Sequence, residues 1–529
     1  MRSLCILGVI AALPLMAADA TQWRPLELSF HSGGAANVEL TCSFKGPRGL
    51  AFSVPGFFDG DGTWKVRFTP TVPGKWSYAT SSSDRELDAK KGAFTATDAK
   101  SDNALYQHGG FLRVSADRHY LTYTDGTPFF WLGDTWWFCP SSLMPFEGFQ
   151  KLIDTRRRQG FTIAHMASLG RGAAKGAADS EQMKARQIDV AYWQEADKYI
   201  RYANDAGIMP VLGMTFHSGL DRNSLEDWKF LWRYVVARYS AYAVSWLICG
   251  EYNLKPAEAP GRAEKALALG AYIKNTDPYR RAMTVHPWYY LGDKRQAWDQ
   301  PWYDFIMFQG GHPGHRKVPP TSVYFEAYHR ANIKPVLEGE CNYEGIYTGK
   351  KGREIGPDDV RLSAYHAIQS GAFGYTYGAQ GLWYPTQDAG DKTFLDWGKT
   401  MPWWQSMLRP GAEQMGVMRR IYESVDWWKL GPRPSAIELS AEVPEQMRPI
   451  AKADGDRTYL MYFPPDFPPA AKASLHLTRP GAAKYTGAWR NPRTGDRVAA
   501  AELTAGPGGV IALPDRPDGQ DWALILSRQ

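Results

Sequence analysis

Carboxylate, imidazole, amide and indole side chains lie at the ends of short apolar runs in the central part of this sequence. Glu251 follows the run Trp-Leu-Ile-Cys-Gly, and Glu340 follows Pro-Val-Leu-Glu-Gly. Two carboxyl groups on opposite sides of an anomeric carbon can hydrolyse a glycosidic bond, because one donates a proton while the other acts as nucleophile or base. We therefore predict that Glu251 and Glu340 form a catalytic pair.

The remaining candidates suit a polyol ligand, because acids and amides hydrogen-bond hydroxyl groups and indoles stack on C–H faces. We predict substrate contacts for Asp134, Trp136, Trp137, His165, His217, Asn253, His286, Trp288, Gln309, His312, Glu338, Tyr343, Tyr377, Gln380 and Trp383. No glycine-rich helix start or lysine clamp accompanies them, which argues against a phosphate ligand. The aromatic content of 14% also fits a surface that binds sugar rings.

Each candidate also has a structural interpretation. Either glutamate could be the buried partner of an arginine or lysine, and the histidines and tryptophans could support the site or cap a core. Several histidines near one mouth could hold a metal ion, although no H-x-H or H-E-x-x-H spacing supports this. We expect neither a metal nor another cofactor.

Residues 103–430 alternate strand-like and helical patterns, and these elements must position the candidates. Eight apolar runs are predicted as strands: Pro128–Trp136, Phe161–Leu169, Ile208–His217, Ala243–Glu251, Arg281–Trp288, Trp302–Gln309, Lys334–Glu340 and Gly371–Tyr377. Helical spacing is found in Phe146–Gln159, Tyr192–Ala206, Asp227–Tyr242 and Pro357–Ser370. Eight such units predict an α/β fold, a (β/α)8 TIM barrel. An open doubly wound sheet is the alternative, but no G-x-G-x-x-G follows the first strand.

In such a barrel the active site lies at the C-terminal ends of the strands. Glu251 and Glu340 end strands four and seven, which lie across the mouth from each other. Glu338 is two residues from Glu340, so simple alternation places both on one face, with Glu338 about 6.6 Å deeper. We therefore predict Glu338 as a supporting residue, held by neighbours such as His165 or His286.

Short alternating runs flank the barrel on both sides. Residues 21–102 contain Leu26–Phe30, Val38–Cys42 and Trp64–Phe68 between glycine-rich turns, and residues 431–529 contain Arg457–Phe463 and Trp522–Leu526. Each pattern predicts a β-sandwich domain.

Residues 1–20 are typical of a signal peptide. Arg2 precedes an apolar run from Leu4 to Ala18, and Ala18-Asp19-Ala20 has the form of a cleavage site. Because Cys5 lies inside the run and no later stretch reaches 18 apolar residues, we expect no lipoprotein or membrane anchor. The prediction is a secreted protein, periplasmic or extracellular in a bacterium.

Charge and cysteine usage narrow the partners further. Lys and Arg number 61 and Asp and Glu 55, a net charge of +6 without a basic stripe, so we expect no nucleic-acid partner. Cys42, Cys139, Cys249 and Cys341 follow no metal or disulfide spacing and are predicted as buried free thiols.

Four segments resemble the apiosidase-like glycoside hydrolase family. They are Trp131–Trp136, Trp246–Glu251, Pro335–Glu340 with Tyr343-Glu344, and Tyr377–Gly381 with Trp383. The similarity covers about Gly109 to Trp427. The flanking segments resemble the sandwich that precedes this barrel in relatives and a C-terminal sandwich of the collagen-binding type, whose binding function we do not transfer.

The resemblance implies a retaining hydrolase of a plant cell-wall glycan, with the acid/base at Glu251 and the nucleophile at Glu340. Two positions depart from the family pattern: Glu251 replaces the common Asp, and Cys341 replaces the common Pro. Both suggest a subsite that differs from that of apiose-releasing members. A non-catalytic polysaccharide-binding protein and a metal-dependent hydrolase or lyase remain the alternatives.

Overall fold

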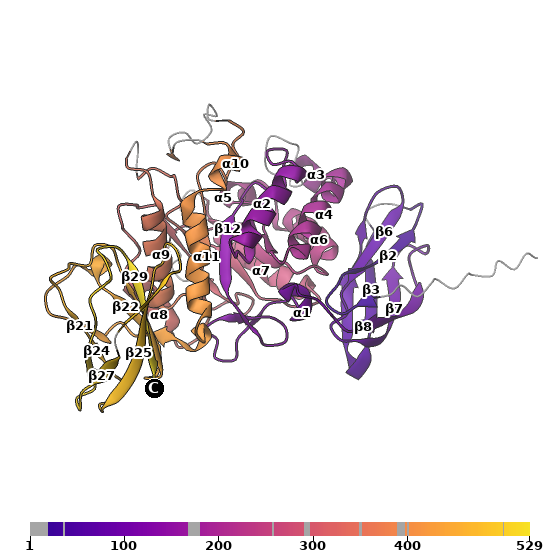
Figure 1. The fold of residues 1–529 in the computed structure, drawn as a ribbon. Helices are drawn as coiled ribbons and strands as arrows, with labels where there is room; N and C mark the ends of the chain where they lie inside the picture. Colours follow the sequence, from indigo (N-terminus) through magenta and orange to yellow (C-terminus); the bar gives the residue numbers. More distant parts are fainter. Residues whose placement is uncertain are drawn as a thin grey trace, which may run out of the picture.

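The computed structural model describes residues 20–34, 38–167, 180–255, 259–289, 297–348, 352–388, 397–398, 401–500 and 502–529. Residues 1–19 of the predicted signal peptide lie outside this set, as do residues 168 and 169 of the second predicted strand. Figure 1 shows a central region of strands and helices between an N-terminal group of sheets and a C-terminal group.

The central region is a nearly closed barrel of eight parallel strands. The strands are β12 (Trp131–Thr135), β13 (Ile163–Met166), β14 (Met209–Leu212), β15 (Ser245–Gly250), β16 (Met283–His286), β17 (Ile306–Gly311), β18 (Val336–Cys341) and β19 (Gly374–Tyr377). Their order is β16-β15-β14-β13-β12-β19-β18-β17, so the first strand pairs with the last. Each strand overlaps its predicted run, and the predicted barrel is confirmed.

Helices follow most of the strands in sequence and surround the barrel (Figure 1), although none is found among the described residues between β16 and β17. The longer ones are α2 (Phe146–Arg158), α4 (Val190–Asp205), α6 (Leu225–Tyr239), α7 (Arg262–Thr276), α8 (Thr321–Tyr328), α9 (Pro357–Ser370) and α11 (Pro410–Glu423), and the short ones are α1 (Ala104–Gln107), α3 (Ser180–Lys184), α5 (His217–Asp221) and α10 (Trp403–Ser406). Local sequence sets their ends: Ser224 and Asp227 form a capping box at the start of α6. Gly207 adopts a φ of 81° just after α4, a conformation that glycine takes without strain.

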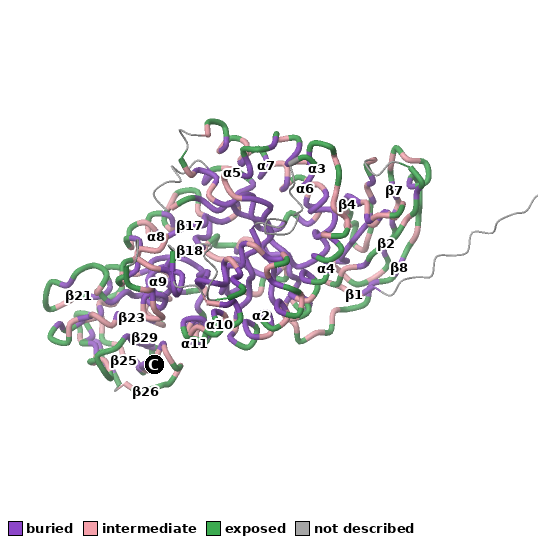
Figure 2. The backbone as a smooth tube through the Cα atoms, turned by 90° about the horizontal axis from the view of Figure 1, so that it is seen from above, coloured by how far each residue is buried: buried purple, intermediate pink, exposed green. Residues whose placement is uncertain are grey.

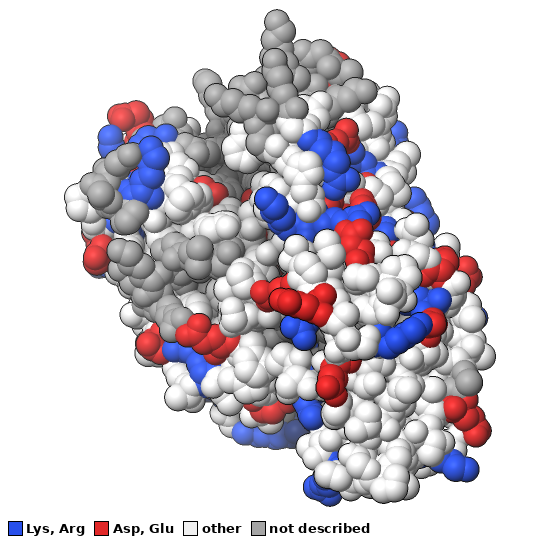
Figure 3. Space-filling view, turned by 90° about the vertical axis from the view of Figure 1, so that its left-hand side faces the viewer, with Lys and Arg blue, Asp and Glu red and all other residues white. Residues whose placement is uncertain are grey.

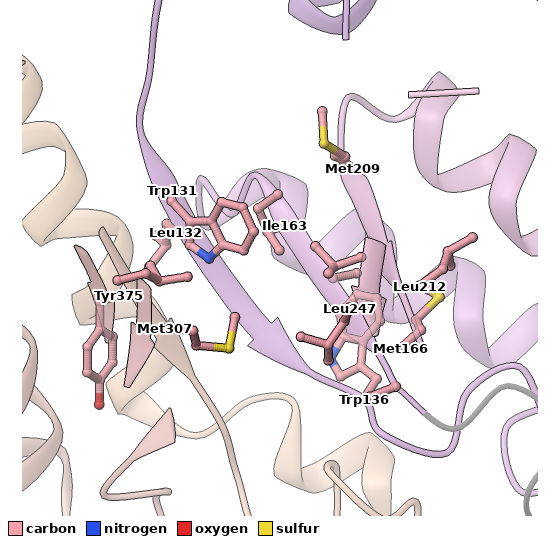
Figure 4. Close-up of a cluster of buried hydrophobic side chains, with 14 of the residues drawn as sticks. Trp131, Leu132, Trp136, Ile163, Met166, Met209, Leu212, Leu247, Met307 and Tyr375 are labelled. Atoms are coloured by element: carbon pink, nitrogen blue, oxygen red, sulfur yellow. The ribbon is translucent and has the colours of Figure 1, made fainter. Parts of the chain in front are cut away.

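A buried apolar cluster fills the barrel below its mouth. It includes Trp131, Ile163, Met209, Leu247 and Met307, which come from five different strands (Figure 4). Figure 2 shows that buried residues dominate the centre of this region, with exposed residues around its edge. This packed floor fixes the directions of the strand ends that carry the site.

The N-terminal region forms two sheets over a common apolar core. One has the order β1-β8-β7-β3-β4 and the other β2-β6-β5. Their bounds are β1 (Ala20–Thr21), β2 (Leu26–His31), β3 (Leu40–Lys45), β4 (Ala51–Pro55), β5 (Phe57–Phe58), β6 (Thr63–Phe68), β7 (Gly74–Ser82) and β8 (Lys91–Thr97). Phe44 of one sheet stacks on Phe68 of the other with ring centroids 3.9 Å apart. Three short strands, β9 (Arg113–Val114), β10 (Leu121–Thr122) and β11 (Pro128–Phe129), lead into the barrel.

A buried ion network joins this region to the barrel. Arg67 on β6 and Arg238 on α6 both donate to the carboxylate of Asp197 on α4, and Arg238 also donates to Asp59 at 2.8 Å. Because a lost partner would leave a buried charge uncompensated, the network favours one fixed orientation of the two regions.

The C-terminal region also contains two sheets. One comprises β20 (Gly431–Pro432), β22 (Ile450–Asp454), β23 (Thr458–Phe463), β29 (Trp522–Arg528), β25 (Ala483–Arg490) and β26 (Arg497–Ala499), with β27 (Leu503–Ala505) paired to β25. The other comprises β21 (Ile437–Leu439), β24 (Ala473–His476) and β28 (Val510–Ala512). Arg361 of α9 donates to Asp521 at 2.7 and 3.0 Å, which fixes this region against the barrel.

Sequence expectations on the cysteines, on membrane-spanning segments and on surface charge can be compared with the structure. Cys42, Cys139, Cys249 and Cys341 are buried free thiols, as predicted. Within the ranges that the structure describes, every helix is too short or too polar to cross a bilayer. Lysine and arginine intermix with acidic residues on the face drawn in Figure 3.

Candidate active site

A cavity of about 280 Å³ lies at the C-terminal ends of the barrel strands. It is at the small end of the range for ligand pockets. Its walls are made by Trp137, Phe138, Phe216, His217, Glu251, His312, Glu340, Tyr343, Ile346, Trp383 and Trp397. Both predicted catalytic glutamates are in this set, and so are five of the predicted substrate contacts.

Glu340 reaches the cavity because strand β18 is irregular. Glu338 pairs with Phe308 of β17, and Glu340 pairs with the very next residue, Gln309. Gly339 is therefore an extra residue, a β-bulge that redirects the side chain after it. A Cβ atom on Gly339 would lie 2.6 Å from Cγ of Met307, so any larger residue would displace the Met307 side chain.

Two histidines hold the Glu340 carboxylate, one at each oxygen. His286 Nε2 lies 3.1 Å from Oε2, and His312 Nε2 lies 3.1 Å from Oε1. The Tyr343 backbone N–H donates to His312 Nδ1, so His312 is an Nε2–H tautomer that donates to Glu340. Burial by itself would raise the pKa of Glu340, but the hydrogen bonds from both histidines outweigh it and hold the pKa well below its usual range. Glu340 is an anion.

His286 is the fully buried member of this pair. Burial opposes its charge, but the hydrogen bond to Glu340 and the negative charge of Glu340 raise its pKa. The carboxylate thus stabilises the proton of the imidazole, and the imidazole stabilises the charge of the carboxylate.

The surroundings of Glu251 differ from those of Glu340. It has a left-handed backbone with φ of 51°, which is unusual for a residue other than glycine and is found at functional sites. Gln309 Nε2 donates to its Oε1 at 3.0 Å, and His217 Nε2 lies 3.6 Å from its Oε2. Burial and the charge of Glu340 together raise the pKa of Glu251, against the hydrogen bond from Gln309. Of the two carboxyl groups, Glu251 is therefore the one that takes up a proton more readily.

Glu338 is not held as predicted from strand alternation. The Tyr324 hydroxyl of α8 donates to it at 2.5 Å, and the backbone N–H groups of Gly310 and Glu340 donate at 3.1 and 2.9 Å. The expected histidine partners are wrong because the bulge puts Glu338 and Glu340 on different faces of β18. Burial raises the pKa of Glu338 to about 7.

Three other predicted contacts point away from the cavity. Asp134 accepts hydrogen bonds from Arg156 at 2.6 Å and from the Trp136 indole at 2.8 Å, so both Asp134 and Trp136 are bound into the layer beneath α2. The Tyr377 hydroxyl donates to Glu344 at 2.7 Å. We correct the prediction for these three residues: alternate residues of a barrel strand face the helices, and their polar groups are satisfied there.

The remaining predicted residues lie behind the cavity wall or beside it. His165 is fully buried between Trp131 and Trp137, and burial lowers its pKa to about 3. Gln380 accepts from the Trp383 indole at 2.9 Å. Asn253 and Trp288 follow the ends of β15 and β16, outside the residues that line the cavity.

Four lining residues escaped the sequence analysis. Phe138 and Phe216 are chain neighbours of the predicted Trp137 and His217: Phe216 lies within the third predicted strand, and Phe138 lies two residues beyond the first. Ile346 and Trp397 come from long connections after β18 and β19, where no periodic signal marks them.

Several histidines lie at the mouth of the barrel, and their ring nitrogens lie close to the carboxyl groups of Glu340 and Glu251. Among the residues that the structure describes, no group of three or more His, Cys, Asp or Glu side chains is arranged to hold a metal ion. The histidine nitrogens that face the cavity are directed at Glu340 and Glu251.

A parallel (β/α)8 barrel with an ionised and a protonatable carboxyl group at its mouth defines the class of glycoside-hydrolase-like barrels. The chain belongs to the apiosidase-like glycoside hydrolase family: the model of the apiosidase-like catalytic domain matches residues 115–429. A second family model, a domain of unknown function termed DUF5060, matches residues 19–83.

Solved structures share this fold. A candidate glycoside hydrolase from Bacteroides vulgatus ATCC 8482 is 19% identical, with a TM-score of 0.72 over 97% of this chain and 100% of the other. A family 5 glycoside hydrolase from the same organism is 21% identical, with a TM-score of 0.67 over 79% and 94%. A third structure, described as a glycoside hydrolase, is 22% identical with a TM-score of 0.66 over 79% and 97%. A search of curated proteins found no match.

Proposed function

We propose that this protein is a retaining glycoside hydrolase in which Glu340 is the nucleophile and Glu251 the acid/base. The observation that carries the proposal is the opposite electrostatic setting of the two carboxyl groups in one cavity. Glu340 is held as an anion by two histidines, and Glu251 has a raised pKa. Pairs of carboxyl groups whose environments separate their pKa values divide the roles of nucleophile and acid.

The reaction has two steps. First, a Glu340 carboxylate oxygen forms a bond to the anomeric carbon as the glycosidic C–O bond breaks, and the leaving oxygen takes the proton of Glu251. Then Glu251, now ionised, removes a proton from water, and that water displaces Glu340 from the sugar. The charge on Glu251 in the second step faces His217 and Gln309.

Retention is tested by NMR of the first anomer released. A retaining enzyme releases the anomer of the substrate, and its two carboxyl groups should stand about 5–5.5 Å apart in a substrate complex. A fluorosugar that traps the glycosyl-enzyme should label Glu340. An inverted first product, or a label on another residue, would contradict the mechanism.

For the substrate class we propose a plant cell-wall glycan, including pectic glycans, because the family resemblance and the aromatic cavity both favour a carbohydrate. Glu251 is one methylene longer than the Asp common at this position, and Cys341 replaces the common Pro. These changes suggest a sugar other than apiose. A screen of purified protein against pectic and hemicellulosic oligosaccharides, with product analysis, tests this class. Binding to such glycans with no product would instead favour the non-catalytic alternative.

We further propose the domain division 21–102, 103–430 and 431–529, with β-sandwiches flanking the barrel, and export through removal of residues 1–20. The two-sheet cores of the flanking regions support the division. Expression in a bacterium and mass spectrometry of the periplasmic and extracellular fractions test export: the mature chain should begin at Thr21.

A further inference from the structure

Trp288 follows β16, the strand next to β15, which ends just before Glu251. Its surface is 41% exposed; in the cavity wall Trp137 and Trp383 are 4% and 9% exposed, and Trp397 is 49% exposed. A large indole left in contact with solvent beside a polar site offers a flat apolar face to a ligand.

The backbone around Trp288 is fixed to the acid. The Trp288 N–H donates to Asn253 Oδ1 at 2.7 Å, and the next N–H, of Tyr289, donates to Gln309 Oε1 at 2.6 Å. Gln309 in turn donates to Glu251. The backbone that carries the indole is therefore held by the same side chains that surround the proposed proton donor.

Asn253 adds a second, independent feature. Its side chain is buried, with 6% exposed, and Nδ2 makes no hydrogen bond with any described residue. The amide orientation is fixed because Oδ1 accepts from Trp288. A buried donor without a partner is costly, and a ligand hydroxyl or a water must satisfy it.

The two glutamate side chains lie at different depths in the site. The Glu340 side chain is 10% exposed and that of Glu251 is 21% exposed, so the nucleophile lies deeper than the acid. The sugar that bonds to Glu340 must occupy the cavity, which is at the small end of ligand pockets. The leaving group must lie beside Glu251, since that residue protonates its oxygen.

We propose that Trp288 and Asn253 form the subsite for a leaving-group sugar. The inference rests on the proposed function. The leaving sugar stacks on the Trp288 indole, and one of its hydroxyl groups accepts from Asn253 Nδ2. The leaving group is thus a sugar ring rather than a small alcohol.

The experiment compares two substrates of the same released sugar. One is a pectic oligosaccharide that the wild type cleaves, and the other is the corresponding glycosyl fluoride, whose leaving group is too small to reach Trp288. For Trp288→Ala, the ratio of kcat/KM for the oligosaccharide to kcat/KM for the fluoride should fall about tenfold. Trp288→Phe should restore most of the ratio.

Trp404 is the matched control, because it is 42% exposed and lies on α10 outside the cavity wall. Trp404→Ala should leave the ratio unchanged. An unchanged ratio in Trp288→Ala would overturn the inference while the glycosidase function stands. No turnover of either substrate by the wild type would instead contradict the proposed function itself.

Discussion

Glu340 and Glu251 are the same residue type at equivalent ends of barrel strands, but their surroundings differ. Glu340 has a histidine donor at each carboxylate oxygen, whereas Glu251 has one amide donor and faces the charge of Glu340. Burial acts to raise the pKa of both, so the donors aimed at each carboxylate decide which one ionises. In the proposed mechanism, two chemically identical side chains are given the roles of nucleophile and acid by their neighbours.

The backbones that carry the two glutamates differ as well. Glu340 follows a bulge at Gly339, and Glu251 adopts a left-handed conformation. Both irregularities interrupt regular strand geometry at the place where a side chain must turn into the cavity. Each of the two strand ends therefore departs from regular barrel geometry: β18 through a bulge, and the residue after β15 through a left-handed backbone.

The largest effect on turnover is expected when the negative charge of Glu340 is removed. Glu340→Gln removes the charge that attacks the anomeric carbon, and turnover should fall about 10,000-fold or more. The measurement is kcat on a cleaved oligosaccharide, with circular dichroism as the control for folding. Normal turnover by this variant would remove Glu340 from the mechanism.

When Glu251 is replaced, the fall in kcat/KM should depend on the leaving group of the substrate. Glu251→Gln cannot protonate the leaving oxygen, so kcat/KM for an oligosaccharide should fall about 100- to 10,000-fold. The loss should be much smaller for a glycosyl fluoride, because fluoride leaves with little help from an acid. Equal losses on both substrates would contradict the assignment of Glu251 as proton donor.

The histidines that distinguish Glu340 can be weakened one at a time. His312→Ala removes one donor to the anion, so the pKa of Glu340 should rise towards its usual value. Activity requires ionised Glu340, so the acidic limb of the kcat/KM profile should move to higher pH, by about one to two units. His312→Gln, which can restore a donor, should reverse part of the shift. An acidic limb that stays in place would show that the two histidines do not set the charge.

In the proposed mechanism Glu251 sets the alkaline limb of the kcat/KM profile, because it must be protonated to act as the acid. Its raised pKa means that activity is lost only as the pH rises above the usual range of a glutamate. Gln309→Leu removes the donor that stabilises the ionised form, so the alkaline limb should move to higher pH by about one further unit. A shift to lower pH would contradict this account.

The smallest effect is expected at Glu338, which faces α8 rather than the cavity. Glu338→Gln keeps an acceptor for the backbone donors, so kcat should change only about twofold, a few tenths of a kcal/mol in the barrier. A fluorosugar should still label Glu340 in this variant. Label on Glu338 in the wild type would exchange the roles of the two residues.

The fold was largely predictable because its signals are local and repeated. Eight apolar runs with intervening helical spacing indicate a barrel before any contact is known. Glu251 and Glu340 could be chosen because they end two of those runs. Asp134 and Tyr377 were misplaced for the same reason: they also stand at strand ends, but the sequence does not tell which face of the strand a side chain takes.

The sequence by itself determined the barrel, its strand ends and the position of a glutamate at two of those ends. Only the tertiary structure decided how each of the two carboxyl groups is held. The histidines that ionise Glu340 lie 54 and 28 residues away along the chain, and the bulge at Gly339 depends on the register with β17. A pKa reflects charges and donors brought together across strands, and a one-residue bulge reverses the face of every side chain that follows. Neither is encoded in the periodicity of a single strand.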